Sequence, residues 1–152
     1  MSNQTTVIAV DVMGGDHGLS VTLPACAEFL HTHPDAGLLL VGNQTQIEPA
    51  LAQYQLGLSD RCQIVHASEV VEMHEAVESA LRRKKDSSMR VALELVQQGK
   101  ADACVSAGNT GVLESALSSL FCTLGEGFAS SPRRYSWYLR MGVLRDFETK
   151  SV

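Results

Sequence analysis

The stretch Val7-Ile8-Ala9-Val10-Asp11-Val12-Met13-Gly14-Gly15-Asp16-His17-Gly18 decides which fold the sequence predicts. Its first four residues form a continuous apolar run, which is typical of a buried strand. A loop rich in glycine and polar side chains follows, and residues 20–32 then suit a helix that Pro34 stops. This order of strand, loop and helix is the building unit of a parallel α/β sheet.

The same alternation continues along the chain. Further buried strands are predicted around 38–41, 64–65 and 103–105, and further helices over 45–55 and 75–84. Ser87-Ser88 is predicted to cap a helix that Gly99 closes. A last helix is predicted to follow residue 111 and to stop at Gly125, with one apolar stripe made of Leu113, Leu117, Leu120, Phe121 and Leu124. The predicted fold class is therefore α/β with a parallel sheet.

The composition indicates one globular domain and argues against several classes of function. The chain has 152 residues, of which 45% are hydrophobic and 19% charged, and its net charge of −5 disfavours nucleic-acid binding. It holds no apolar run of 18 residues, and its first residues do not resemble a secretory signal, so we expect neither a membrane-spanning helix nor secretion. Its four cysteines form no CxxC pair, and no metal site or cofactor is predicted.

The loop after the first strand is the first candidate site. Gly14 and Gly15 allow the backbone to come close to a ligand, and free N–H groups before a helix favour an anion. Asp11, Asp16 and His17 add acid–base capacity. The structural alternative is a tight strand-to-helix turn with capping aspartates.

The loop Ser106-Ala107-Gly108-Asn109-Thr110-Gly111 is the second candidate site. It joins a predicted strand to a predicted helix and offers two hydroxyl groups, one amide and backbone donors, which suits a phosphate group. It lacks the GK[ST] ending of a P-loop. The structural alternative is an ordinary helix cap made by Asn109 or Thr110.

Four consecutive cations, residues 82–85, form the third candidate, because they precede the serine-capped helix. Arginine binds phosphate with two parallel hydrogen bonds, and lysine binds it as a point charge. The alternative is a solvated charged face. The nearby His74-Glu75 pair lacks the second histidine of HExxH, so a zinc protease is disfavoured.

These motifs occur in the order of a known family, and the segment from Ile8 to Leu113 resembles the PlsX family. Its members are the acyl-carrier-protein-dependent phosphate acyltransferases of bacterial phospholipid synthesis. The stretches that carry the resemblance are 9–18, 39–42, 82–89 and 106–113. The resemblance implies transfer of an acyl group from the acyl carrier protein thioester to inorganic phosphate, which gives acyl phosphate without a metal or nicotinamide.

The resemblance also implies a fold, partners and site residues. The fold is the α/β/α sandwich of the isocitrate/isopropylmalate dehydrogenase type, usually a homodimer, in the cytoplasm with a peripheral link to a membrane acyltransferase. Asp11, Asp16 and His17 would orient groups or move protons. The groups expected to hold phosphate are Gly14, Gly15, Arg82, Lys85, Ser87, Ser88, Ser106, Gly108, Asn109, Thr110 and Gly111.

The end of the chain departs from the family, because residues 126–152 match none of its pattern. Residues 114–152 also hold six of the eight aromatic side chains. We therefore expect residues 1–124 to be the N-terminal part of the acyltransferase domain and residues 125–152 to be an unmatched, frameshifted tail. The C-terminal half of the fold would then be missing, leaving an aggregation-prone half-domain. The alternatives are a coenzyme A-dependent relative, and a non-catalytic remnant that binds phosphate or caps another subunit.

Overall fold

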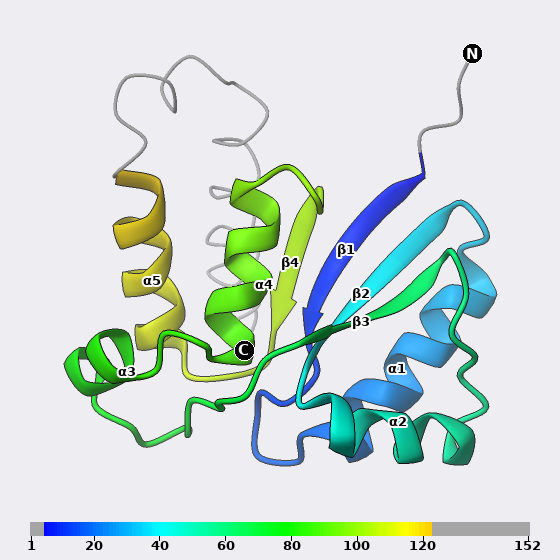
Figure 1. The fold of residues 1–152 in the computed structure, drawn as a ribbon, viewed down its shortest axis with the longest axis horizontal. Coiled ribbons are helices and arrows are strands. Elements are labelled where there is room, and N and C mark those ends of the chain that lie inside the picture. The colour runs from blue at the N-terminus through cyan, green and yellow to red at the C-terminus, as the bar shows by residue number, and fades with distance from the viewer. Residues whose placement is uncertain (1–4, 123–152) are drawn as a thin grey trace, which may run out of the picture. The chain divides into compact units, whose positions relative to one another are not determined.

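A four-stranded parallel sheet organises the chain in the computed structural model, which describes residues 5–122. The sheet has the strand order β3-β2-β1-β4, and every neighbouring pair is parallel (Figure 1). Its strands are β1 (Thr6–Asp11), β2 (Ala36–Gly42), β3 (Cys62–His66) and β4 (Ala103–Ser106). The predicted α/β class is confirmed, while the dehydrogenase-type sandwich stays a prediction.

Among residues 5–122, five helices follow the strands in the order that the sequence predicts. They are α1 (Leu19–Thr32), α2 (Gln44–Gln53), α3 (Val77–Arg83), α4 (Ser88–Gln97) and α5 (Thr110–Cys122). The predicted cap of α4 is confirmed, because the Ser87 hydroxyl accepts a hydrogen bond of 3.4 Å from the Arg90 N–H. None of the described helices is long and apolar enough to cross a membrane.

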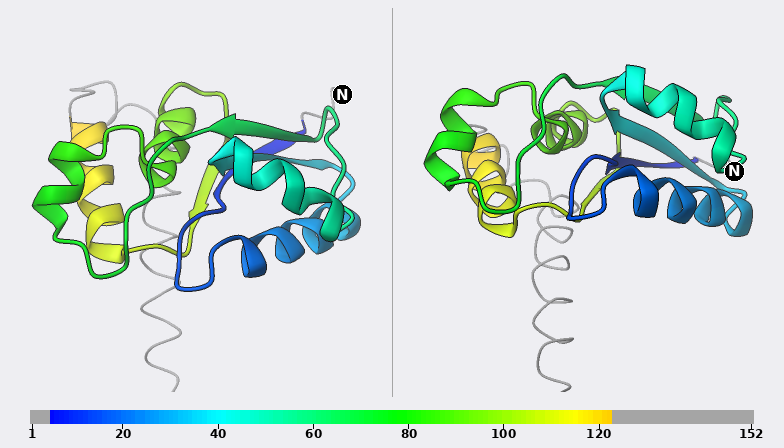
Figure 2. Two further views of the ribbon diagram at one scale, coloured as in Figure 1. Left: turned by 60° about the horizontal axis from the view of Figure 1, so that its bottom comes forward. Right: turned by 90° about the horizontal axis from the view of Figure 1, so that it is seen from below.

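Helices α1 and α4 lie on opposite faces of the sheet (Figure 2). Because side chains alternate along a strand, β1 turns Ile8 and Val10 toward α1 and its completely buried Ala9 toward the other face. The core on the α1 side contains side chains from α1, α2, β2 and β3. Its buried members are Val12, Leu23, Cys26, Leu38, Leu40, Ile47, Leu51, Leu56 and Cys62.

A smaller core joins α3, α4 and the start of α5. It consists of Val71, Ala80, Met89 and Val112, with Leu113 packed at its margin. Of the predicted apolar stripe of α5, Leu113 packs against this core and Leu117 and Leu120 are half-buried, while the fully buried residues of the helix are Val112 and Ala116. The predicted positions Phe121 and Leu124 lie outside the residues whose side chains the structure describes.

The described part of the chain belongs mainly to one compact unit, residues 1–117. A second unit begins at Ser118, and the structure describes it only as far as Cys122, at the end of α5. The predicted stop at Gly125 and the predicted boundary between residues 124 and 125 lie outside the described residues.

Candidate functional site

The strand order places a topological switch point between β1 and β4. From β1 the chain proceeds through α1 to β2 and β3, whereas β4 lies on the other side of β1. In open parallel sheets, ligands bind beyond the carboxyl ends of the strands at such a point. The first two candidate loops leave the sheet here, because the last residues of the two strands, Asp11 and Ser106, are paired in register.

Asp11 and Ser106 join the two loops through their side chains. The Ser106 hydroxyl donates a hydrogen bond of 2.7 Å to Asp11 Oδ2 and accepts one of 3.1 Å from the Gly108 N–H. Asp11 Oδ1 accepts from the N–H groups of Gly14 at 3.1 Å and Met13 at 3.3 Å. Asp11 is only 2% exposed, so this Asp11–Ser106 junction is an internal link between loops.

The glycines of both loops are required by close packing around the junction. A Cβ atom added at Gly14 would lie 2.6 Å from Asp11 Oδ2 and 3.1 Å from the Gly108 nitrogen. A Cβ atom at Gly108 would lie 2.8 Å from the terminal methyl of Met89. Gly15 has a φ of +89°, in the left-handed region that favours glycine. A side chain at Gly14 would therefore press against the second loop, whereas one at Gly108 would displace the end of the Met89 side chain.

Asp16 and His17 lie on the open side of the first loop. Both are exposed, and their side chains make no hydrogen bond or ion pair with the described residues. Helix α1 begins directly after them, at a Gly18 cap that offers no side-chain acceptor. The first N–H groups of a helix lack intrahelical partners, so this helix start is open to an anion.

Asn109 is a structural link in the second loop. Its Oδ1 accepts a hydrogen bond of 3.2 Å from the Val112 N–H, which caps α5. Its Nδ2 donates to the carbonyl oxygens of Met73 at 2.9 Å and Glu75 at 3.1 Å. The capping alternative named for Asn109 is thus present, and the exposed Thr110 follows it as the first residue of α5.

The loop between β3 and α3, residues 67–76, carries a set of contacts that the sequence analysis missed. Lys84 Nζ lies 2.7 Å from Glu75 Oε2 and also donates to the Val70 carbonyl. Asp86 Oδ2 accepts hydrogen bonds from both the N–H and the hydroxyl of Ser68. The position of this loop after β3, at the same edge of the sheet as the other loops, was the available signal.

These contacts change the acidity of two carboxyl groups in that region. The Lys84 ammonium, by hydrogen bond and charge, lowers the pKa of Glu75 below its usual 4.5. Hydrogen bonds from Ser68 lower the pKa of Asp86 below its usual 3.8. Both groups therefore stay ionised and hold the loop at neutral pH.

The third candidate divides into exposed cations and buried serines. Arg82 and Lys85 are exposed, and Arg82 makes an ion pair of 2.9 Å with Glu78. Ser87 and Ser88 are at most 2% exposed; Ser87 caps α4, and the Ser88 N–H donates to the Glu69 carbonyl at 3.0 Å. The geometry assigns these serines to the α4 start, while the two cations reach solvent.

The described residues offer no activated side-chain nucleophile. Burial raises the pKa of the Cys26 and Cys104 thiols to about 12, and burial also raises the pKa of Cys62. The hydrogen bonds of the Ser106 hydroxyl within the described residues go to the Asp11 carboxylate and the Gly108 N–H, and not to a histidine that could act as its base. Over residues 5–122 no three histidine, cysteine or acidic side chains gather as a metal site would require.

Comparisons with known proteins agree with the sequence resemblance. The family described as fatty acid synthesis protein matches residues 6–124. Proteins named phosphate acyltransferase from Herminiimonas arsenicoxydans and Bordetella petrii are 55% identical over 109 residues and 61% identical over 104 residues. These alignments cover 72% and 68% of this chain but only 30% and 29% of the two relatives. The chain thus spans about a third of the length of the relatives it matches.

Proposed function

Because the chain belongs to the fatty acid synthesis protein family, we propose that its switch-point loops are part of a phosphate acyltransferase site. The proposed reaction starts from the thioester of an acyl carrier protein and inorganic phosphate. A phosphate oxygen attacks the thioester carbonyl carbon, the C–S bond breaks, and the carrier leaves as its free thiol with the proton. Acyl phosphate is the product.

The observation that carries this proposal is the open start of α1 beside the junction of the two glycine loops. Phosphate needs several donors directed at one point, and a helix start supplies them together with the positive end of its dipole. The absence of an activated nucleophile among residues 5–122 fits a reaction in which phosphate is the nucleophile. Orientation against the thioester then supplies the rate enhancement.

The geometry supports a division of labour among the candidate residues. Asp16 and His17 are free to orient phosphate or move its proton, and the exposed cations Arg82 and Lys85 can compensate its charge. Asp11 and Ser106 hold the loops together.

Under this proposal, the remaining predicted phosphate ligands contribute through their backbone groups or through packing. They are Gly14, Gly15, Ser87, Ser88, Gly108, Asn109, Thr110 and Gly111.

The larger setting is part of the same proposal. The chain spans about a third of its relatives, so acyl carrier protein, a homodimer and a peripheral link to a membrane acyltransferase are proposed for the complete enzyme in the cytoplasm. The same coverage favours a second candidate for this chain alone, a phosphate-binding module without transfer activity. A coenzyme A thioester as donor is the variant within the enzyme class.

One experiment separates these candidates. The chain is incubated with long-chain acyl carrier protein and inorganic phosphate, acyl phosphate is trapped with hydroxylamine, and phosphate binding is measured by calorimetry. Transfer supports the acyltransferase, and competition with acyl coenzyme A identifies the preferred donor. Binding without transfer supports the module, and loss of binding in His17→Ala assigns it to the α1 start. Absence of both binding and transfer would refute the proposed site.

A further inference from the structure

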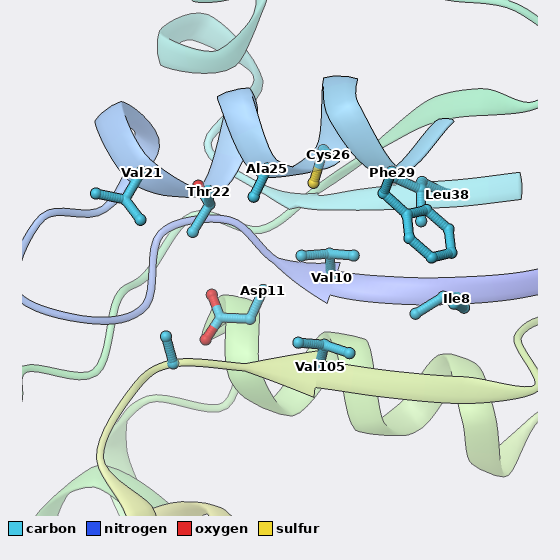
Figure 3. Close-up of a pocket in the computed structure, with 11 residues that line it drawn as sticks. Ile8, Val10, Asp11, Val21, Thr22, Ala25, Cys26, Phe29, Leu38 and Val105 are labelled. Atoms are coloured by element: carbon cyan, nitrogen blue, oxygen red, sulfur yellow. The ribbon is translucent and has the colours of Figure 1, made fainter. Parts of the chain in front are cut away.

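The second candidate loop, residues 106–111, is held from two sides. On one side Asp11 accepts a hydrogen bond from the Ser106 hydroxyl, and Figure 3 shows this carboxylate between the ends of β1 and β4. On the other side the Asn109 amide donates a hydrogen bond of 3.1 Å to the Glu75 carbonyl oxygen. The loop between β3 and α3, which contains Glu75, is therefore the second support of the candidate loop.

Glu75 connects this second support to a cation. Its carbonyl oxygen accepts from Asn109, while its carboxylate lies 2.7 Å from Lys84 Nζ at the end of α3. Lys84 also donates to the Val70 carbonyl, so one ammonium group holds both ends of the segment from Val70 to Glu75. The side chains of Lys84 and Glu75 are only 26% and 17% exposed, so solvent weakens this ion pair less than it weakens an ion pair on the surface.

Lys84 differs from its neighbours in the run of cations at residues 82–85. Arg82, Arg83 and Lys85 are exposed, whereas Lys84 is half-buried. An exposed cation is free to meet an anion from solvent, but the Lys84 ammonium already contacts a carboxylate and a carbonyl oxygen of the same chain. Its contacts therefore point to a role within the loop and not to a direct contact with phosphate.

We propose that Lys84 and Glu75 are positioning residues for phosphate binding, because their ion pair holds the Asn109 amide through the Glu75 carbonyl. The Oδ1 atom of Asn109 accepts a hydrogen bond of 3.2 Å from the Val112 N–H and so fixes the first turn of α5. When the ion pair is broken, the Glu75 carbonyl shifts, the amide turns, and the donors at the start of α5 no longer converge on one point. This inference rests on the proposed function, since it concerns the same phosphate site.

Two variants of opposite charge change separate positioning from simple attraction of phosphate. Lys84→Met removes a positive charge and Glu75→Gln removes a negative one, and each breaks the ion pair. Attraction alone would weaken phosphate binding in the first variant and strengthen it in the second. Positioning predicts that both bind inorganic phosphate about fivefold more weakly, as calorimetry would measure. Lys84→Arg keeps a cation beside Glu75 and should retain most of the affinity.

Hydrogen exchange followed by NMR tests the structural step without phosphate. The amides of Val112 and Leu113 both donate to Asn109, so in Lys84→Met and Glu75→Gln they should exchange about tenfold faster, while the amides of β1 and β2 stay unchanged. Lys100→Met is the matched control, because Lys100 is exposed and its side chain makes no hydrogen bond or ion pair with the residues described. It removes the same charge as Lys84→Met and should leave both measurements within about twofold of the wild type.

Three outcomes would overturn the proposal. The first is tighter phosphate binding by Glu75→Gln, which would assign the effect to charge attraction. The second is unchanged exchange at Val112 in both variants. The third is faster exchange throughout β1 and β2 as well, which would mean that the ion pair supports the whole domain and not this loop. If the wild type binds no phosphate, the proposed function fails, and exchange at Val112 still decides whether Lys84 positions the loop.

Discussion

Replacement of Asp11 by alanine tests whether the junction between the two loops is structural. The carboxylate accepts hydrogen bonds from the Ser106 hydroxyl at 2.7 Å and from the Gly14 N–H at 3.1 Å, with a longer third bond of 3.3 Å from Met13. Asp11→Ala leaves the buried Gly14 N–H without an acceptor, which costs about 1–3 kcal/mol. The half-buried Ser106 hydroxyl can donate to water instead, so the loss of its hydrogen bond to Asp11 costs about 1–2 kcal/mol. The expected loss of unfolding free energy is about 2–5 kcal/mol.

The assay is urea unfolding followed by far-ultraviolet circular dichroism, which reports on the helices and the sheet. Asp16→Ala is the matched control, because it removes an exposed carboxylate from the same loop and should change stability by about 0.5 kcal/mol or less. Asp11→Asn keeps an acceptor for Gly14 and should fall between the two. The reasoning is refuted if the unfolding free energies of Asp11→Ala and Asp16→Ala differ by less than 0.5 kcal/mol, which is about the measurement error.

Three further predictions follow from the contacts around the site. Asn109→Ala should cost about 1–3 kcal/mol in urea unfolding, because it removes the cap of α5 and two bonds to the preceding loop, whereas Asn109→Asp should retain the cap. Because the pKa of Glu75 is lowered from 4.5 in the folded state, its contribution to stability is complete above pH 4.5 and is lost as the pH falls below that value; Lys84→Met should reduce this pH dependence. With thiol pKa values of about 12, Cys26 and Cys104 should resist iodoacetamide at pH 8 until urea unfolds the chain, as mass spectrometry would record; fast alkylation of native protein would contradict their burial.

The sequence predicted the order of strands and helices because the relevant signals are local. The apolar run at 7–10 leads into a loop with glycines at 14 and 15, the run at 38–41 is followed by Gly42, and the Ser87 cap lies where α4 begins. Local signals did not predict which face of α5 packs against the core. Whether Val112 or Leu113 is buried depends on Ala80 and Met89, which come from other helices. Helical periodicity leaves a stripe uncertain by about one residue until its partner is known.

The placement of the two glycine-rich loops at one edge of the sheet was predicted, but the contacts within and between them were not. Glycine-rich loops after buried strands indicated the carboxyl edge of the sheet, and β1 and β4 are indeed neighbours there. No local pattern indicates that the Asn109 amide donates to the carbonyls of Met73 and Glu75, more than thirty residues away. The ion pair of Lys84 with Glu75 was equally unpredictable, because Lys84 is only one cation in a charged run of the sequence. Such pairs depend on the path of the chain and not on spacing.

The hydrogen-bond inventory of the site separates residues that hold it from residues that are free to react. A carboxylate that already accepts three internal hydrogen bonds, as Asp11 does, cannot take a substrate proton without releasing the loop that it organises. Asn109 is committed in the same way at both ends of its amide. The side chains of His17 and Asp16 make no such hydrogen bonds with the described residues. Substitutions of Asp11 or Asn109 should therefore lower both the stability of the chain and its binding of phosphate. Substitution of His17 should lower phosphate binding while the unfolding midpoint stays constant, and a parallel loss of stability in His17→Ala would contradict this separation.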